Sequence, residues 1–128
     1  MKEDKKMQKI EAHKKMIRDI KFTADNSKIV TVSDDLTISV FDVIKFQKYV
    51  DLAGHKGNIN YVDCHPTDKS KIITGSYDRT VKVWDIENKT CLHTINFSDN
   101  VWCVKFSHDG SLIGASNIFV YLFSIISH

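Results

Sequence analysis

Three residues in the middle of the chain, His55, Ser76 and Asp78, are of the types that form a hydrolase triad. In such an enzyme the imidazole takes the proton of the serine hydroxyl, and the carboxylate orients the imidazole. The serine oxygen must also be exposed beside an oxyanion hole. Ser76 instead falls on a predicted inner strand beneath Trp84. The pattern therefore favours a structural hydrogen-bond network, and we predict that the chain is not an enzyme.

The residue pattern offers little support for a metal or cofactor site. Cys64 and His65 are adjacent at a predicted strand end, where their side chains point to opposite faces, and no second Cys or His pair follows at ligand spacing. Calcium would need a loop with several carboxylates and a glycine, which the aspartates of this chain do not supply. The five glycines are dispersed and form no phosphate-binding loop. We predict no metal and no cofactor.

The side chains named above belong to an internal repeat. The segments 17–22, 59–64 and 101–106 align on one another with a constant step of 42 residues, from position 17 to 59 and from 59 to 101. A repeat of this length is typical of architectures in which each copy is one supersecondary unit. Three copies fill nearly the whole chain.

Each copy has the pattern of short strands separated by turns. A turn cluster such as residues 65–68 follows the first strand, and a period-2 alternation such as that of residues 80–85 marks the third. No window places apolar residues at spacings of three and four over two helical turns. The predicted fold class is therefore all-β. The expected strands are 17–22, 28–33, 37–42, 46–52, 59–64, 71–76, 80–85, 90–95, 101–106 and 112–116, with a last one near the end of the chain.

The middle copy carries a family resemblance. Its motif residues are Gly54-His55, Ser76-Tyr77-Asp78-Arg79-Thr80 and Trp84-Asp85. Their types, with 29 residues from the histidine to the tryptophan, resemble the WD-repeat signature of β-propeller blades. The resemblance implies a hydrogen-bonded chain within the blade, formed by His55, Ser76, Asp78 and Trp84. Thr74 has the same strand parity as Ser76 and could take its place.

The flanking copies depart from this signature. The first keeps a partial network of His13, Ser33 and Asp35, but a phenylalanine replaces the tryptophan, so the indole donor is lost. In the third copy, Phe97 stands where the histidine would be and Phe123 where the tryptophan would be. We expect that blade to be held by apolar packing alone.

The finer pattern resembles one branch of the family, the small WD-repeat subunit shared by the superkiller RNA-decay complex and the polymerase-associated elongation complex. The resemblance rests on runs such as residues 31–35, 81–85, 90–94 and 101–105, and it covers about residues 7–125. It implies a non-enzymatic scaffold that binds protein partners within a multi-subunit complex, in RNA decay or transcription elongation.

The phase of the repeat divides the chain into four segments. We expect residues 1–12 to form the outer strand of a preceding or closing blade, 13–53 the first blade, 54–95 the second, and 96–128 a degenerate third that lacks its fourth strand. Propellers close with four to eight blades, so three four-stranded blades make a partial ring. Either the protein is longer, or two chains exchange a strand and self-associate through their open terminal blades.

The charge distribution argues against a nucleic-acid protein. The net charge is +2, but the first sixteen residues hold six lysines and three acids, which leaves 12 of the 18 basic and 13 of the 16 acidic residues for the rest. This nearly neutral body lacks the basic face that phosphate binding requires, so direct binding of nucleic acid is not expected. The alternative is an RNA-contacting module that uses Trp102 and the N-terminal lysines.

The cysteines and the N-terminus bear on localisation. Three cysteines in no paired spacing, and an N-terminus without an apolar stretch, favour a reducing compartment. We expect the protein in the cytoplasm, the nucleus or both, with no membrane partner. Cys64 itself is expected in the core, because its repeat equivalents are Phe22 and Phe106.

The remaining candidate surface is the mouth of the ring. The candidate partner-binding rim consists of Arg18, Asp34, Asn60, Tyr77 and Trp102. Three of these are repeat equivalents at the start of a first strand and share the parity of the expected core residues Ile20, Val62 and Val104. Their early position predicts that they reach the rim instead of the core. Exposed tryptophan and arginine are common in binding hot spots. The alternative is a Trp102 that simply packs on the neighbouring blade.

Overall fold

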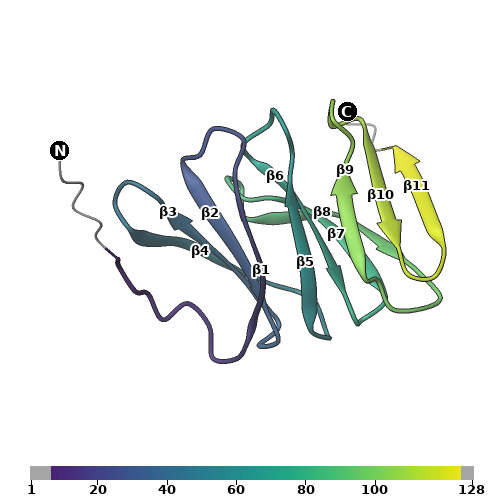
Figure 1. The fold of residues 1–128 in the computed structure, drawn as a ribbon, viewed down its shortest axis with the longest axis horizontal. Helices are drawn as coiled ribbons and strands as arrows, with labels where there is room; N and C mark the ends of the chain where they lie inside the picture. The colour runs from purple at the N-terminus through teal and green to yellow at the C-terminus, as the bar shows by residue number, and fades with distance from the viewer. Residues whose placement is uncertain (1–6, 125–128) are drawn as a thin grey trace.

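The computed structural model describes residues 7–124, and strands are the only regular elements in this range. The all-β prediction is therefore confirmed. Three antiparallel sheets follow one another along the chain (Figure 1). The first contains β1 (Ile17–Phe22), β2 (Lys28–Ser33), β3 (Thr37–Asp42) and β4 (Gln47–Ala53); the second contains β5 (Ile59–Cys64), β6 (Lys71–Ser76), β7 (Thr80–Asp85) and β8 (Thr90–Asn96); the third contains β9 (Cys103–Phe106), β10 (Leu112–Ser116) and β11 (Val120–Ser124).

Each sheet is a meander in which consecutive strands pair, so its first strand lies at one edge. Figure 1 shows the three sheets side by side, with the first strands β1, β5 and β9 next to one another. This is the arrangement of propeller blades around a hub, here forming an open arc. The mouth of the arc is therefore bordered by residues at the ends of β1, β5 and β9.

The core lies between neighbouring sheets. One buried cluster joins the first and second sheets, and another joins the second and third. Adjacent residues of β6 divide between them, since Ile72 belongs to the first cluster and Ile73 to the second, and both are fully buried. Other members include Val30, Val32, Ile38, Val40, Ile59, Val62 and Trp84 of the first cluster, and Val81, Val83, Val101, Val104 and Ile113 of the second. The second sheet is thus covered on both faces.

A glycine lets the third sheet approach the second. A Cβ atom built on Gly75 would lie 2.9 Å from Cγ1 of Val101 and 3.0 Å from Cγ1 of Val104. The backbone N–H of Val101 also donates to the carbonyl of Ser76, which ties the chain to the second sheet before β9 begins. For this reason β9 starts at Cys103, two residues later than predicted.

The turn after the first strand of each sheet is held by the same pair of hydrogen bonds. Asp25, Asp68 and Asp109 each accept hydrogen bonds from the backbone N–H and the hydroxyl of the serine two residues later. These bonds hold the pKa of Asp25 and of Asp109 at about 2. The sequence signal is a repeated Asp-x-Ser triplet, which the strand pattern alone did not single out.

The outer faces of the terminal sheets are uncovered within residues 7–124. Ile20, which was expected in the core, is 52% exposed, because nothing in the described chain packs on that face of β1. That prediction is wrong, whereas its equivalents Val62 and Val104 are buried. At the other end, Leu122 on β11 is 69% exposed. Self-association through these faces stays a prediction.

The N-terminal segment differs from its prediction. Residues 7–16 form no strand, so the outer strand expected over 1–12 is absent from the part that the structure describes, and residues 1–6 lie outside the described residues. Within that part the third sheet ends with its third strand, β11.

Cys64, expected in the core, is partly buried and packs against the first cluster, and burial raises the pKa of its thiol to about 12. Residues 7–124 include no helix long and apolar enough to cross a membrane.

Candidate functional site

The second blade contains a continuous hydrogen-bond chain that links its edge loop to its sheet. His55 Nδ1 lies 2.7 Å from a carboxylate oxygen of Asp78, and Nε2 lies 2.6 Å from Oγ1 of Thr74. Because an ionised carboxylate only accepts, Nδ1 carries the proton and Nε2 accepts from the threonine hydroxyl. The same Thr74 oxygen accepts the indole N–H of Trp84 at 2.9 Å. Every polar atom in this buried chain therefore has a partner.

Thr74, and not Ser76, is the hydroxyl in this chain, which corrects the predicted member. Trp84 pairs with Ile72 across the strands, so its ring reaches the residue two positions along, which is Thr74. Ser76 lies two residues farther, at the turn. Its hydroxyl donates to the carbonyl of Gly57 and accepts the backbone N–H of Asp78. Ser76 thus supports the turn, and its oxygen is not available as a nucleophile.

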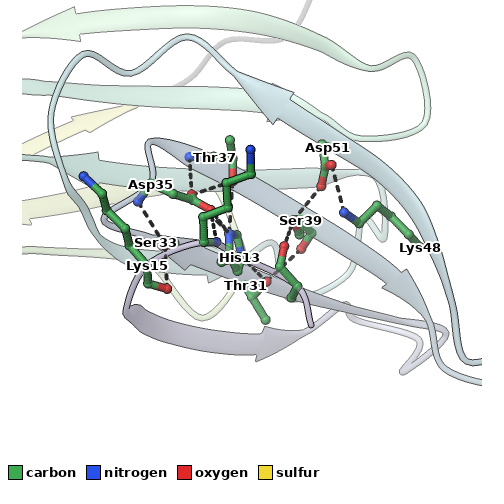
Figure 2. A network of polar contacts seen from close by, with 11 residues as sticks. His13, Lys15, Thr31, Ser33, Asp35, Thr37, Ser39, Lys48 and Asp51 are labelled. Carbon is green, nitrogen blue, oxygen red and sulfur yellow. Dashed lines mark hydrogen bonds and ion pairs between the residues drawn. The ribbon is translucent and has the colours of Figure 1, made fainter. Parts of the chain in front are cut away.

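The first blade repeats the arrangement without the indole (Figure 2). His13 Nδ1 lies 3.0 Å from a carboxylate oxygen of Asp35, and Nε2 lies 2.7 Å from Oγ1 of Thr31. Ser33, the predicted member, again supports the turn by accepting the backbone N–H of Asp35 and donating to the carbonyl of Lys15. Thr31, and not Ser33, is therefore the hydroxyl bound to the histidine in the first blade.

The third blade replaces the polar chain with aromatic side chains. The rings of Phe97 and Phe123 are 6.3 Å apart, close to the 6.2 Å between the rings of His55 and Trp84. Phe97 also meets Tyr121 edge to face at 4.8 Å. The same position in the blade is thus filled by apolar packing, as the sequence predicted.

The turn carboxylates of the first two blades stay ionised in acid. Burial of Asp35 opposes ionisation, but hydrogen bonds donated by Thr37 and by the backbone of Lys14 outweigh it and hold its pKa at about 2. Burial likewise opposes ionisation of Asp78, yet the hydrogen bonds from His55 and Thr80 keep its pKa well below the usual range. Each carboxylate is therefore a permanent acceptor that ties a loop to a sheet.

Two further carboxylates join neighbouring sheets, and sequence reasoning missed them. Asp19 on β1 accepts the backbone N–H of Val62 on β5 at 3.2 Å, and Asp63 on β5 accepts the backbone N–H of Phe106 on β9 at 2.8 Å. The two aspartates are not repeat equivalents, because they stand 44 residues apart instead of 42. An aspartate within the inner strand of each of the first two copies was the available signal.

The structure brings the five predicted rim residues together at the mouth. Arg18 and Asn60 sit at register shifts where β1 and β5 begin, and Trp102 directly precedes β9. A bulge re-aims the side chain that it carries, and these three side chains line one depression together with Tyr77 and the additional residue Tyr61. Asp34 binds Arg18 from the side through two hydrogen bonds of 2.6 and 2.7 Å.

The aromatic pair of the rim is accessible. The rings of Tyr77 and Trp102 are 6.3 Å apart and inclined by 56°. Trp102 is 55% exposed and Tyr77 is 43% exposed. Trp102 therefore packs on the neighbouring blade and still keeps about half of its surface exposed, and its role in partner binding stays a prediction.

Within residues 7–124, the side chains are not grouped in a way that supports metal binding or a disulfide. Residues 7–124 contain no group of three or more His, Cys, Asp or Glu side chains positioned to hold a metal ion. The three cysteines are free, and Cys91 alone among them is exposed. The rim is thus the best-formed candidate for a functional surface.

Comparison with known proteins gives two findings. The sequence matches the family described as WD domain, G-beta repeat, over residues 4–42, 46–85 and 89–123. It is also 37% identical over 108 residues to eukaryotic translation initiation factor 3 subunit I of Pyricularia oryzae, an alignment that covers 84% of this chain and 31% of that protein. The chain therefore spans about a third of the length of the curated relative that it matches.

The family match is staggered against the sheets. Its second segment, 46–85, contains the outer strand β4 of the first sheet and the strands β5, β6 and β7 of the second. One sequence repeat thus spans two neighbouring sheets. Because of this stagger, the outer strand of one sheet belongs to the same sequence repeat as the first three strands of the next sheet.

Proposed function

Because this chain belongs to the WD-repeat family, we propose that it is a non-enzymatic docking scaffold that binds protein partners within a multi-subunit complex. The observation that carries this proposal is the convergence of the rim at the mouth of the arc, where Trp102 and Tyr77 are exposed side by side. Exposed aromatic side chains at the centre of a concave surface are typical of protein-binding hot spots. The triad-like residues are occupied in structural bonds, which supports a binding function over catalysis.

We further propose that the multi-subunit complex acts in RNA metabolism. The sequence pattern resembles a subunit shared by RNA-decay and transcription-elongation complexes, whereas the matched relative is named as a translation initiation factor subunit. We propose that this protein acts in the cytoplasm, the nucleus or both, as the unpaired cysteines of the sequence favour. Identification of the captured subunits decides among the three complexes.

An RNA-contacting function is the alternative, and the charges disfavour it. The guanidinium of Arg18 is already bound by Asp34, so this pair offers no free cation to a phosphate. Contacts to phosphates supply most of the affinity of nucleic-acid proteins. A protein partner, which needs no such cation, fits the rim better.

The test is affinity capture from cells, comparing wild-type protein with Trp102→Ala. We expect wild type to retain the subunits of one of these complexes at about 0.3 M salt, where phosphate-driven binding is weakened, and Trp102→Ala to lose them. Leu92→Ala, which changes an exposed apolar residue on the outer strand β8, is the matched control and should retain them. RNA retention with a steep salt dependence, or undiminished capture by Trp102→Ala, would contradict docking through the rim.

A further inference from the structure

One residue that lines the depression at the mouth carries an unsatisfied donor. The side-chain amide nitrogen of Asn60 is buried and has no hydrogen-bond partner within the described part of the chain. Asn60 lines the depression with Arg18, Tyr61, Tyr77 and Trp102. Leaving a buried N–H unpaired is unfavourable, and an acceptor that enters the depression removes this penalty. Rotation about the terminal torsion of asparagine is soft, so the amide can turn toward such an acceptor.

The formal charges at the depression cancel. Both carboxylate oxygens of Asp34 accept hydrogen bonds from the guanidinium of Arg18, at 2.7 and 2.6 Å. This pairing raises the pKa of Arg18 and lowers that of Asp34, so both groups stay ionised and matched. An incoming carboxylate would have to compete with Asp34, and an incoming ammonium with Arg18. The depression is therefore suited to an uncharged group.

The walls of the depression are aromatic. Trp102 and Tyr77 form a tilted pair, and Tyr61 on β5 adds a third ring that is partly exposed. Rings of this kind bury apolar side chains with little loss of conformational entropy, because they have only two side-chain torsions. The walls thus favour an apolar side chain, and the buried amide of Asn60 favours a hydrogen-bond acceptor next to it.

We propose that this depression binds an extended, uncharged peptide segment of a partner protein, with an apolar side chain against Trp102 and Tyr77 and a backbone carbonyl accepting the side-chain N–H of Asn60. The inference rests on the proposed docking function and specifies the chemistry of the partner. Every peptide residue carries a carbonyl acceptor, so the apolar residue itself brings the acceptor within reach. A nucleotide offers acceptors as well, but its phosphate would find the guanidinium of Arg18 already paired with Asp34.

The test selects peptides on the purified full-length protein and then compares variants. Phage displaying random ten-residue peptides are the probe, the selected sequences are resynthesised, and decauridylate is the RNA probe. We expect the selected peptides to share an uncharged apolar residue. Their affinity should fall about tenfold or more in Asn60→Asp, which turns the donor into an acceptor, and in Trp102→Ala, since a lost hydrogen bond of about 1.4 kcal/mol corresponds to a factor of ten.

Two controls separate binding from folding. Asn96→Asp makes the same substitution on the outer strand β8 and should change affinity by less than about twofold, as expected for a surface site away from the ligand. Asn60→Leu removes the donor at similar size without adding charge and should weaken binding like Asn60→Asp. Thermal unfolding of each variant confirms that the fold is kept. In wild type, the side-chain amide resonances of Asn60 should shift when peptide is added.

The outcomes distinguish this inference from the proposed function. If no peptide is selected, if selected peptides require an acidic or basic residue, or if they bind Asn60→Asp and Asn60→Leu as well as wild type, the inference is overturned. Docking through the rim still stands in those cases when Trp102→Ala loses the captured complex. If decauridylate binds more tightly than the peptides and displaces them, the peptide inference and the docking proposal both fail.

Discussion

The indole N–H of Trp84 donates a 2.9 Å hydrogen bond to Thr74 Oγ1, the same oxygen that lies 2.6 Å from the imidazole of His55. A single hydroxyl therefore serves the strand residue and the loop residue at once. Because all three side chains are buried, removing the hydroxyl of Thr74 leaves both the indole N–H of Trp84 and Nε2 of His55 without a partner.

Thr74→Val tests this shared role, because valine keeps the shape and removes only the hydroxyl. We expect the free energy of unfolding to fall by about 2–4 kcal/mol, since the indole N–H of Trp84 and Nε2 of His55 both lose their partner. Thr94→Val on β8 removes an exposed hydroxyl that contacts Lys82 and Cys91, and it should cost less than about 0.5 kcal/mol. Denaturant unfolding measures both, and equal losses would contradict the assignment.

The two tryptophans should separate stability from binding. Trp84 is 2% exposed, so Trp84→Ala should cost about 3–5 kcal/mol through a cavity and lost bonding. Trp102 lies at the rim, and Trp102→Ala should cost less than about 1 kcal/mol while abolishing partner capture. Thermal unfolding compares the two variants. A similar loss of stability in both would show that Trp102 is a core residue.

Two glycines in equivalent sheets should respond differently to alanine. A Cβ on Gly75 would meet Val101 and Val104 at 2.9 and 3.0 Å, so Gly75→Ala should destabilise the protein by about 1–3 kcal/mol. A Cβ on Gly114 would meet nothing within 4 Å, so Gly114→Ala should be neutral or slightly stabilising. Chemical denaturation of the two variants, side by side, measures the contrast. A stable Gly75→Ala variant would mean that the second and third sheets pack less closely than described.

The carboxylate of Asp63 should protect one amide of the next sheet. In Asp63→Ala the backbone N–H of Phe106 loses its 2.8 Å acceptor, and we expect about 1–2 kcal/mol less stability. Hydrogen exchange at Phe106 should accelerate more than exchange at Val62, which depends on Asp19. Unchanged exchange at Phe106 would show that Asp63 does not link the two sheets in solution.

Stability should decline in acid because of the turn carboxylates. The pKa of Asp35 is about 2 in the folded chain against an ordinary 3.8, so the unfolded state binds more protons as the pH falls. The stabilisation is complete above about pH 5 and is lost as the pH falls through about 4 towards 2. Asp35→Asn should therefore show a shallower acid decline. Denaturant unfolding between pH 5 and 2 measures the slope, and parallel slopes would contradict the linkage.

The sequence predicted most of the elements because its signals are local. The step of 42 residues and the alternation of apolar side chains placed nearly every strand within two residues of its observed bounds. The WD-type residues also identified the loops that meet the sheets, including those of His55 and Asp78. The rim residues followed from repeat equivalence, since residues at the same point of successive repeats face the same mouth.

Other features depended on contacts between strands and sheets. Thr74 and Ser76 have the same parity, and only the pairing of Trp84 with Ile72 decides which hydroxyl the indole reaches. Ile20 has the pattern of a core residue, but burial requires a covering sheet, which the described chain does not provide on that face.

The one-dimensional order of residues thus determined that this protein forms three repeated sheets with a polar chain in the first two, because periodicity and turn residues act over short separations. The tertiary structure alone decided which oxygen closes that chain and which apolar faces are covered. It also decided that the amide nitrogen of Asn60 is buried, with no partner among residues 7–124, beside two exposed rings. These properties arise from contacts between residues that lie 10 or more positions apart in the sequence, such as Thr74 and Trp84, and no local pattern specifies them.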